Sequence, residues 1–66
     1  MQILLNGEAH DLPDRITALA LLEQQGLADR RVAVEINLEI IPRSAYAQTE
    51  LRHGDRVEIV RAIGGG

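Results

Sequence analysis

The chain opens with the stretch MQILLNGEAHDL (residues 1–12), in which a short apolar segment runs into a turn pair and then into a more polar segment. Residues 1–5 have the composition of a strand, and Asn6-Gly7 tolerates the positive φ angles of a two-residue hairpin turn. The return segment, residues 8–12, is polar enough for the edge of a sheet, and Pro13 ends it because proline has no backbone N–H to donate. A β-hairpin is therefore predicted at the start of the chain.

A helix is predicted over residues 18–25, directly after this hairpin. Thr17 is a suitable N-cap, and Gly26 supplies the left-handed residue at which a helix commonly ends. Leu19 and Leu22 recur at helical spacing, so we expect these two side chains to cover the sheet.

Alternating apolar and polar residues predict two further strands, over residues 32–37 and 56–63. In the last strand Val57 and Ile59 should point inward, while Glu58 and Val60 should point outward. A turn over residues 37–39, a very short strand at Ile40-Ile41, one helical turn over residues 43–47 and a turn at Gly54-Asp55 are expected between the two strands.

This order of elements predicts an α+β fold with one mixed sheet. A strand that follows a hairpin and a helix rejoins the sheet by a crossover, and a single helix then packs across one face. We expect a roll of four to five strands, with the last strand parallel to the first and central in the sheet. The predicted core layer contains Ile3, Leu5, Leu19, Leu22, Val34, Ile36, Val57 and Ile59.

Composition excludes several classes of function. The 66 residues include no lysine and no cysteine and carry a net charge of −3, which leaves no disulfide or thiolate chemistry and disfavours nucleic-acid binding. Neither a membrane span nor a signal peptide is visible, so we expect a cytoplasmic protein with protein partners. So short a chain has little room for a deep catalytic pocket, which argues against an enzyme acting alone.

Candidate catalytic and metal-binding residues are few. His10 and His53 are far apart and have no cysteine or neighbouring histidine, so we expect solvated or packed histidines and no metal site. Ser44 lacks the context of a nucleophile, and Glu35 and Glu39 are expected to be charges on a solvent-facing surface. No bound cofactor is predicted.

The terminal Gly64-Gly65-Gly66 follows directly on an apolar strand. It is interpreted as a frayed or artificial end, as a linker, or as a substrate arm that enters the narrow cleft of another protein. In the last case Gly66 carries the chemistry: its carboxylate is ionised at neutral pH and needs activation, for example by attack on the α-phosphate of ATP in a partner enzyme. The predicted organisation is a domain over residues 1–63 and a flexible glycine tail over residues 64–66.

Several motifs together resemble the bacterial ThiS sulfur carriers of thiamin biosynthesis. These are the start MQILLNG (1–7), the helix TALALL (17–22), VEIN (34–37) leading to IPR (41–43), GDRVEI (54–59) and the terminal Gly65-Gly66. The resemblance spans the whole chain and implies a ubiquitin-like β-grasp fold. It also implies that an E1-like ThiF-type enzyme adenylates Gly66, that a cysteine desulfurase or another donor supplies sulfur for a thiocarboxylate, and that thiazole synthase receives the sulfur.

A partner also needs a surface to hold, because ordering the arm costs backbone entropy. We expect this surface to include Leu4 and Val60 on the outer sheet face, Ala62 nearby, and the arm residues Gly64 and Gly65. Three alternatives stay open at this point: the similar small subunit of molybdopterin synthase, a ubiquitin-like modifier joined to amines, and a non-covalent interaction domain.

Overall fold

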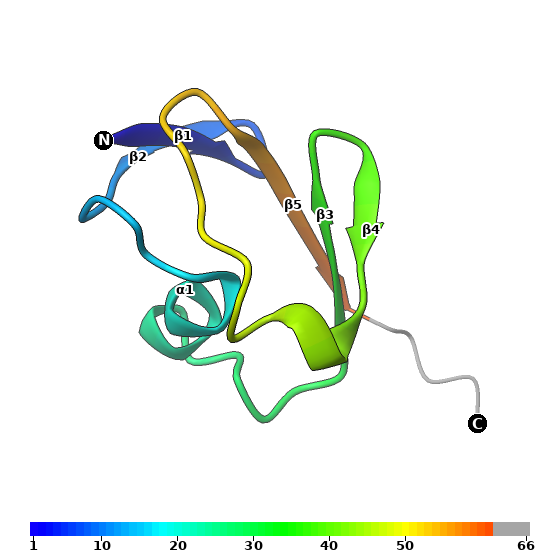
Figure 1. Ribbon diagram of the computed structural model, residues 1–66. Helices are drawn as coiled ribbons and strands as arrows, with labels where there is room; N and C mark the ends of the chain where they lie inside the picture. The colour runs from blue at the N-terminus through cyan, green and yellow to red at the C-terminus, as the bar shows by residue number, and fades with distance from the viewer. Residues whose placement is uncertain (62–66) are drawn as a thin grey trace.

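The structure is a computed structural model that describes residues 1–61 (Figure 1). Its elements are β1 (Gln2–Leu5), β2 (Glu8–Asp11), α1 (Ala18–Gln24), β3 (Val32–Ile36), β4 (Glu39–Ile41), the 3-10 helix η1 (Arg43–Ala45) and β5 (Arg56–Arg61). The predicted domain boundary after Ile63 and the predicted glycine tail over 64–66 lie outside the described residues.

The five strands form one mixed sheet in the order β2-β1-β5-β3-β4. β5 is parallel to β1 and antiparallel to β3, and the two hairpins β1–β2 and β3–β4 are antiparallel. A parallel pair cannot be joined by a tight turn, so the chain between β1 and β5 crosses over one face of the sheet and supplies α1 on the way (Figure 1). This arrangement confirms the predicted α+β roll and the central, parallel last strand.

Both hairpins turn on asparagine in a left-handed conformation. Asn6 and Gly7 have φ values of 50° and 85°, as the sequence predicts for a two-residue turn. Asn37 and Leu38 have φ values of 52° and 71°. Positive φ is unusual for a side chain as large as that of Leu38, and this tight turn lets β4 begin at Glu39, one residue earlier than predicted.

The helix begins and ends where its sequence signals indicate. The Thr17 hydroxyl accepts a hydrogen bond of 3.1 Å from the Ala20 N–H, and Gly26 adopts φ 72° just beyond the last turn. The prediction that Leu19 and Leu22 cover the sheet was wrong for Leu19. In the structure Leu21 is fully buried, whereas Leu19 is only half-buried. The Leu19 N–H donates to the Tyr46 carbonyl oxygen at 3.1 Å, which fixes this residue beside the segment after η1 rather than over the sheet.

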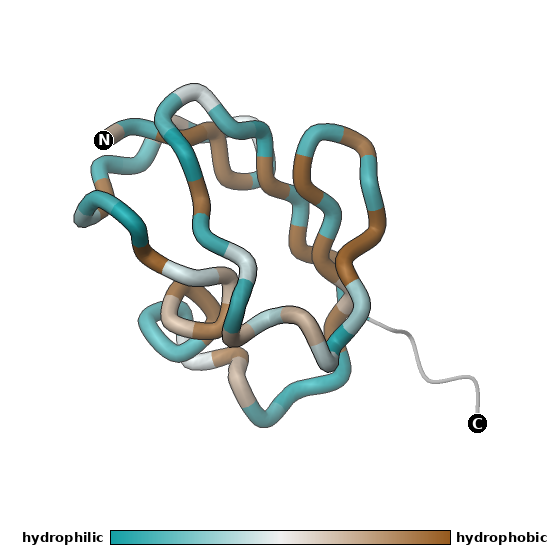
Figure 2. Tube along the Cα trace, in the orientation of Figure 1, coloured by the Kyte–Doolittle hydropathy of each residue, from teal (hydrophilic) through white to brown (hydrophobic). Residues whose placement is uncertain are grey.

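One apolar core lies between the sheet and the crossover. The strand residues predicted to point inward are buried, except that Ile36 is half-buried, and Figure 2 shows the matching hydropathy along the chain. Leu12, Tyr46 and Leu51 join the core from irregular segments, where no periodicity indicates burial. The segment that carries Leu51 is held against the helix, because the Ala18 N–H donates to the Thr49 carbonyl oxygen at 2.8 Å.

Two asparagine side chains attach the hairpin turns to β5. Asn6 accepts from the Ile59 N–H at 2.9 Å and donates to the Ile59 carbonyl oxygen at 3.3 Å. Asn37 accepts from the Arg56 N–H at 3.0 Å and donates to an Asp55 carboxylate oxygen at 3.0 Å. Each turn residue thus continues the hydrogen bonding of the sheet beyond the end of its own strand.

The burial of the helix predicts unequal effects of two leucine truncations. Leu21→Ala should lower the free energy of unfolding by about 2–5 kcal/mol, since it empties a fully enclosed site. Leu19→Ala should lower the free energy of unfolding by less than half as much, because the Leu19 side chain is partly solvated. Thermal unfolding followed by circular dichroism measures both, and an equal or reversed order would contradict the observed rotation of the helix.

The attachment of Asn6 to β5 predicts a graded series of stabilities. Asn6→Gly keeps the left-handed conformation but removes both hydrogen bonds to Ile59, so it should lose about 1–2 kcal/mol of unfolding free energy. Asn6→Asp retains the accepting oxygen and should lose less. Urea unfolding gives the values, and a glycine variant as stable as the parent would show that these bonds add nothing.

Candidate functional site

The residues expected to carry the chemistry follow directly on β5. Gly66, Gly65, Gly64 and Ala62 all lie outside the described residues, whereas Arg61 is the last residue of the strand. β5 is hydrogen-bonded on one side to β1 and on the other to β3. The residues that follow β5 are therefore attached to a central strand of the sheet.

The outer face of the sheet, opposite the helix, carries the predicted surface residues. Leu4 is 39% exposed and Val60 is 53% exposed, so both lie at the surface on the neighbouring strands β1 and β5, as expected. They do not lie side by side, however, because Leu4 is level with Arg56, and Val60 is four positions further along β5. At the rise of a strand, four positions correspond to about 13 Å.

Acidic side chains separate the two apolar positions. Glu58 lies between Arg56 and Val60 on the outward side of β5, and its cross-strand partner on β3 is Glu35. Like charges directly opposite each other destabilise a sheet. This row gives the centre of the outer face a negative charge, with an apolar position on either side.

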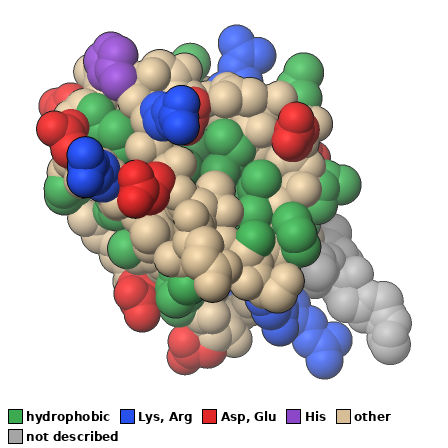
Figure 3. Space-filling view, in the orientation of Figure 1, with side chains coloured by type: hydrophobic (Ala, Val, Ile, Leu, Met, Phe, Trp, Pro, Cys, Tyr) green, Lys and Arg blue, Asp and Glu red, His purple; other side chains and the backbone are tan. Residues whose placement is uncertain are grey.

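Two exposed hydrophobic residues of the outer face were not predicted. Ile40 is 73% exposed and is paired with Glu35, and Leu38 is 77% exposed at the tip of the β3–β4 hairpin. Figure 3 shows hydrophobic side chains at the surface in this part of the molecule. Alternation along β4 could have identified Ile40, since Ile41 is the inward residue of that short strand.

A shallow hollow surrounds Leu4. It has a volume of about 280 Å³ and is lined by Leu4, Asn37, Leu38, Gly54 and Arg56. These residues come from β1, the β3–β4 turn, the turn before β5 and the first residue of β5, so the hollow is formed by segments far apart in the sequence. The outer face therefore offers two places for a partner: this hollow and the apolar pair formed by Val60 and its cross-strand partner Ala33.

Both histidines lie beside strand β1. The His53 Nδ1 accepts from the Gln2 N–H at 3.0 Å, and half-buried His10 is level with Ile3 on the neighbouring strand. In residues 1–61, no three histidine, aspartate or glutamate side chains gather closely enough to hold a metal ion. No helix of the described part is long and apolar enough to cross a membrane.

Comparison with known proteins assigns this architecture to a family. The family model described as ThiS family matches residues 3–66. The sulfur carrier protein ThiS of Escherichia coli is 36% identical over 100% of both chains. The crystal structure of the thiamine biosynthesis protein ThiS from Geobacter metallireducens has a TM-score of 0.87 at 30% identity, again over 100% of both chains.

Two longer relatives contain a similar stretch. Proteins named thiazole synthase from Paramagnetospirillum magneticum and Magnetococcus marinus are 48% and 41% identical over all 66 residues of this chain, which spans only 20% of the length of each. The family model, the full-length match to the Escherichia coli protein and the shared fold agree with one another. This chain belongs to the ThiS family and has its ubiquitin-like β-grasp fold.

Proposed function

We propose that this chain is a sulfur carrier of thiamin biosynthesis whose Gly66 carboxylate becomes a thiocarboxylate. The observation that carries the proposal is the match to the Escherichia coli sulfur carrier over the whole of both chains. The terminal glycines support it, because a carbonyl flanked only by glycine can enter a narrow cleft without a clash of Cβ atoms.

The proposed chemistry has two steps at the terminal carbonyl. An oxygen of the Gly66 carboxylate attacks the α-phosphorus of ATP, the bond to the β-phosphate breaks and pyrophosphate leaves, giving an acyl-adenylate. Sulfide or a persulfide then attacks the carbonyl carbon, and AMP leaves with one former carboxylate oxygen. After attack by a persulfide, a thiol cleaves the S–S bond of the acyl disulfide, which releases the thiocarboxylate and leaves a disulfide on the donor side. The ionised carboxylate is a nucleophile but a poor electrophile, so activation has to precede the arrival of sulfur.

This chain acts as a co-substrate in the proposal, and its partners supply the catalysis. A ThiF-type adenylating enzyme holds ATP, and a cysteine desulfurase or another donor provides sulfur. Thiazole synthase receives the sulfur; the two relatives that bear this name and contain a ThiS-like stretch support this pairing. We place the reactions in the cytoplasm, where ATP is available and thiols stay reduced.

We further propose that partners hold the outer sheet face while the arm enters their cleft. Val60 lies one residue before the end of β5, so a protein that binds this position also reaches Ala62, Gly64 and Gly65. Leu4 provides a second apolar contact, about 13 Å away along the strands. The acidic pair Glu35 and Glu58 between these positions favours a partner with a cationic group at the centre of its surface.

The carrier role predicts a change of mass at Gly66. Protein isolated from its source, or treated with the adenylating enzyme, ATP and a sulfur donor, should gain about 16 Da as oxygen is exchanged for sulfur. A chain that lacks Gly66 should stay unchanged and serves as the control. Intact-protein mass spectrometry measures the shift, whereas amide conjugates of higher mass would identify a ubiquitin-like modifier, and an inert terminus would identify a non-covalent interaction domain.

The outer face predicts variants that fold but are not activated. Val60→Asp and Leu4→Asp should each slow adenylation at least ten-fold, because a charge in an apolar contact has to be desolvated. Gln48→Asp adds the same charge at an exposed position of the crossover and should leave the rate within two-fold. ATP–pyrophosphate exchange gives the rates, circular dichroism confirms folding, and full activity of both face variants would refute the proposed surface.

A further inference from the structure

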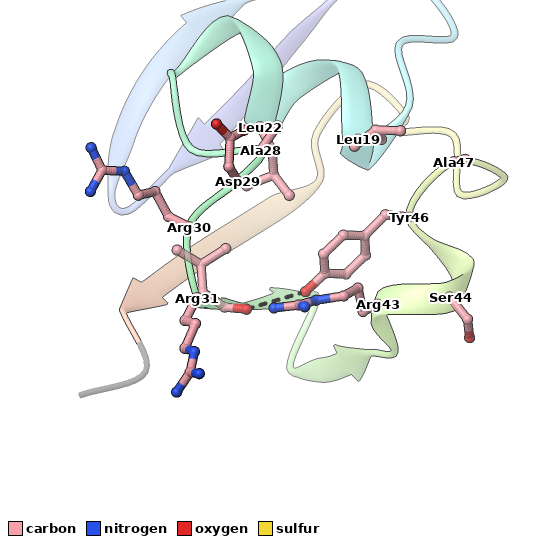
Figure 4. A pocket seen from close by; sticks show the side chains of 11 residues that line it. Leu19, Leu22, Ala28, Asp29, Arg30, Arg31, Arg43, Ser44, Tyr46 and Ala47 are labelled. Atoms are coloured by element: carbon pink, nitrogen blue, oxygen red, sulfur yellow. Dashed lines mark hydrogen bonds between the residues drawn. The ribbon is translucent and has the colours of Figure 1, made fainter. Parts of the chain in front are cut away.

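A second hollow lies on the helix side of the sheet, at the end where β3 begins and β5 ends. It has a volume of about 350 Å³, within the range of small-molecule sites, and lies between α1, the loop before β3 and η1 (Figure 4). We call it the arginine pocket and define it by its main lining residues, which are Leu22, Arg30, Arg31, Val32, Arg43 and Tyr46. The outer-face surface proposed above shares none of these residues.

The floor of the arginine pocket is apolar and belongs to the buried core. Leu22, Val32 and the ring of Tyr46 are all members of the buried core. The Tyr46 hydroxyl donates to the Val32 carbonyl oxygen at 3.5 Å (Figure 4). This bond uses the proton of the hydroxyl and leaves its oxygen lone pairs unused, so the floor presents a small apolar surface with one polar edge.

The rim of the arginine pocket is cationic. In Figure 4, the Arg43 side chain extends across the pocket beside the Tyr46 hydroxyl, and Arg30 and Arg31 extend outward from the loop before β3. In residues 1–61 none of these three guanidinium groups forms an ion pair or a hydrogen bond, and the one ion pair of that part joins the Met1 amino group to Asp14. Asp29 is the single acidic residue of the lining.

The local charge of the pocket is opposite to that of the chain. Three of the seven arginines line it, and a fourth, Arg61, is paired in register with Val32. The whole chain nevertheless has a net charge of −3, so the remaining surface is strongly acidic. A large polyanion would meet that acidic surface, whereas a small anion at the rim lies close to three arginines and one aspartate, Asp29.

We propose that the arginine pocket binds a small molecule that joins an oxyanion, a phosphate or a carboxylate, to a flat apolar body. The oxyanion accepts charge-assisted hydrogen bonds from the Arg43 guanidinium, with Arg30 and Arg31 turning in from the rim. The flat body lies against half-buried Leu19, exposed Ala47 and the accessible edge of Tyr46. The lining residue Val32 is paired in register with Arg61, the last residue of β5, so this ligand lies near the end of that strand.

Four probes test the proposal in titrations followed by ¹H–¹⁵N correlation spectra of the isolated protein. AMP carries a phosphate and a flat base, benzoate carries a carboxylate and a flat ring, inorganic phosphate lacks the flat body, and adenosine lacks the anion. AMP, benzoate or both should shift the amide signals of residues 28–32 and 43–47 in a saturable way, with inorganic phosphate weaker and adenosine without effect. The tighter of the first two probes identifies the oxyanion as phosphate or carboxylate.

Two matched variants separate a site from general charge. Arg43→Gln should weaken binding of the better probe about ten-fold or more. Arg52→Gln removes the same charge at an exposed position outside the pocket and should change the affinity less than two-fold. The proposal would be overturned by amide shifts spread over the whole chain, by a lack of saturation with every probe, or by an equal loss of affinity in both variants. Since the titrations need neither Gly66 nor a partner, their outcome is separate from that of the carrier function.

Discussion

The pairing of β5 with strands on both of its sides is the constraint on which the rest of the structure depends. The parallel partner β1 and the antiparallel partner β3 place β5 in the centre of the sheet, and Asn6 and Asn37 add hydrogen bonds near its ends. A parallel neighbour obliges the chain to cross over one face. This crossover brings α1 and the segment that carries Leu51 onto the sheet, so the core is a consequence of the strand order.

The central position of β5 also suits the role proposed for the C-terminal glycines. A partner that pulls on Gly66 acts on a strand that is hydrogen-bonded on both of its sides, and such central strands open less readily than edge strands. The described residues of the body have no need of catalytic groups in this role. In the proposed role they present surfaces by which activating and receiving proteins would hold the carrier.

The two sides of the molecule offer different chemistry. The outer sheet face has apolar positions on either side of the acidic pair Glu35 and Glu58, and it suits a protein with a complementary cationic centre. The arginine pocket on the helix side combines a buried apolar floor with cations that form no ion pair in residues 1–61. Because the two surfaces do not overlap, the carrier could hold a small anion while a protein partner covers the sheet.

Local chemistry in the sequence determined the hairpin at Asn6-Gly7, the helix start at Thr17 and the alternation of β5, and hence the exposure of Leu4 and Val60. Turn conformation, helix capping and strand periodicity each depend on neighbouring residues. The tertiary structure alone decided the burial of Tyr46, the rotation of α1 onto Leu21 and the grouping of Arg30, Arg31 and Arg43 around one pocket. These features depend on how segments far apart in the chain pack and on the register between strands, and no local pattern specifies either.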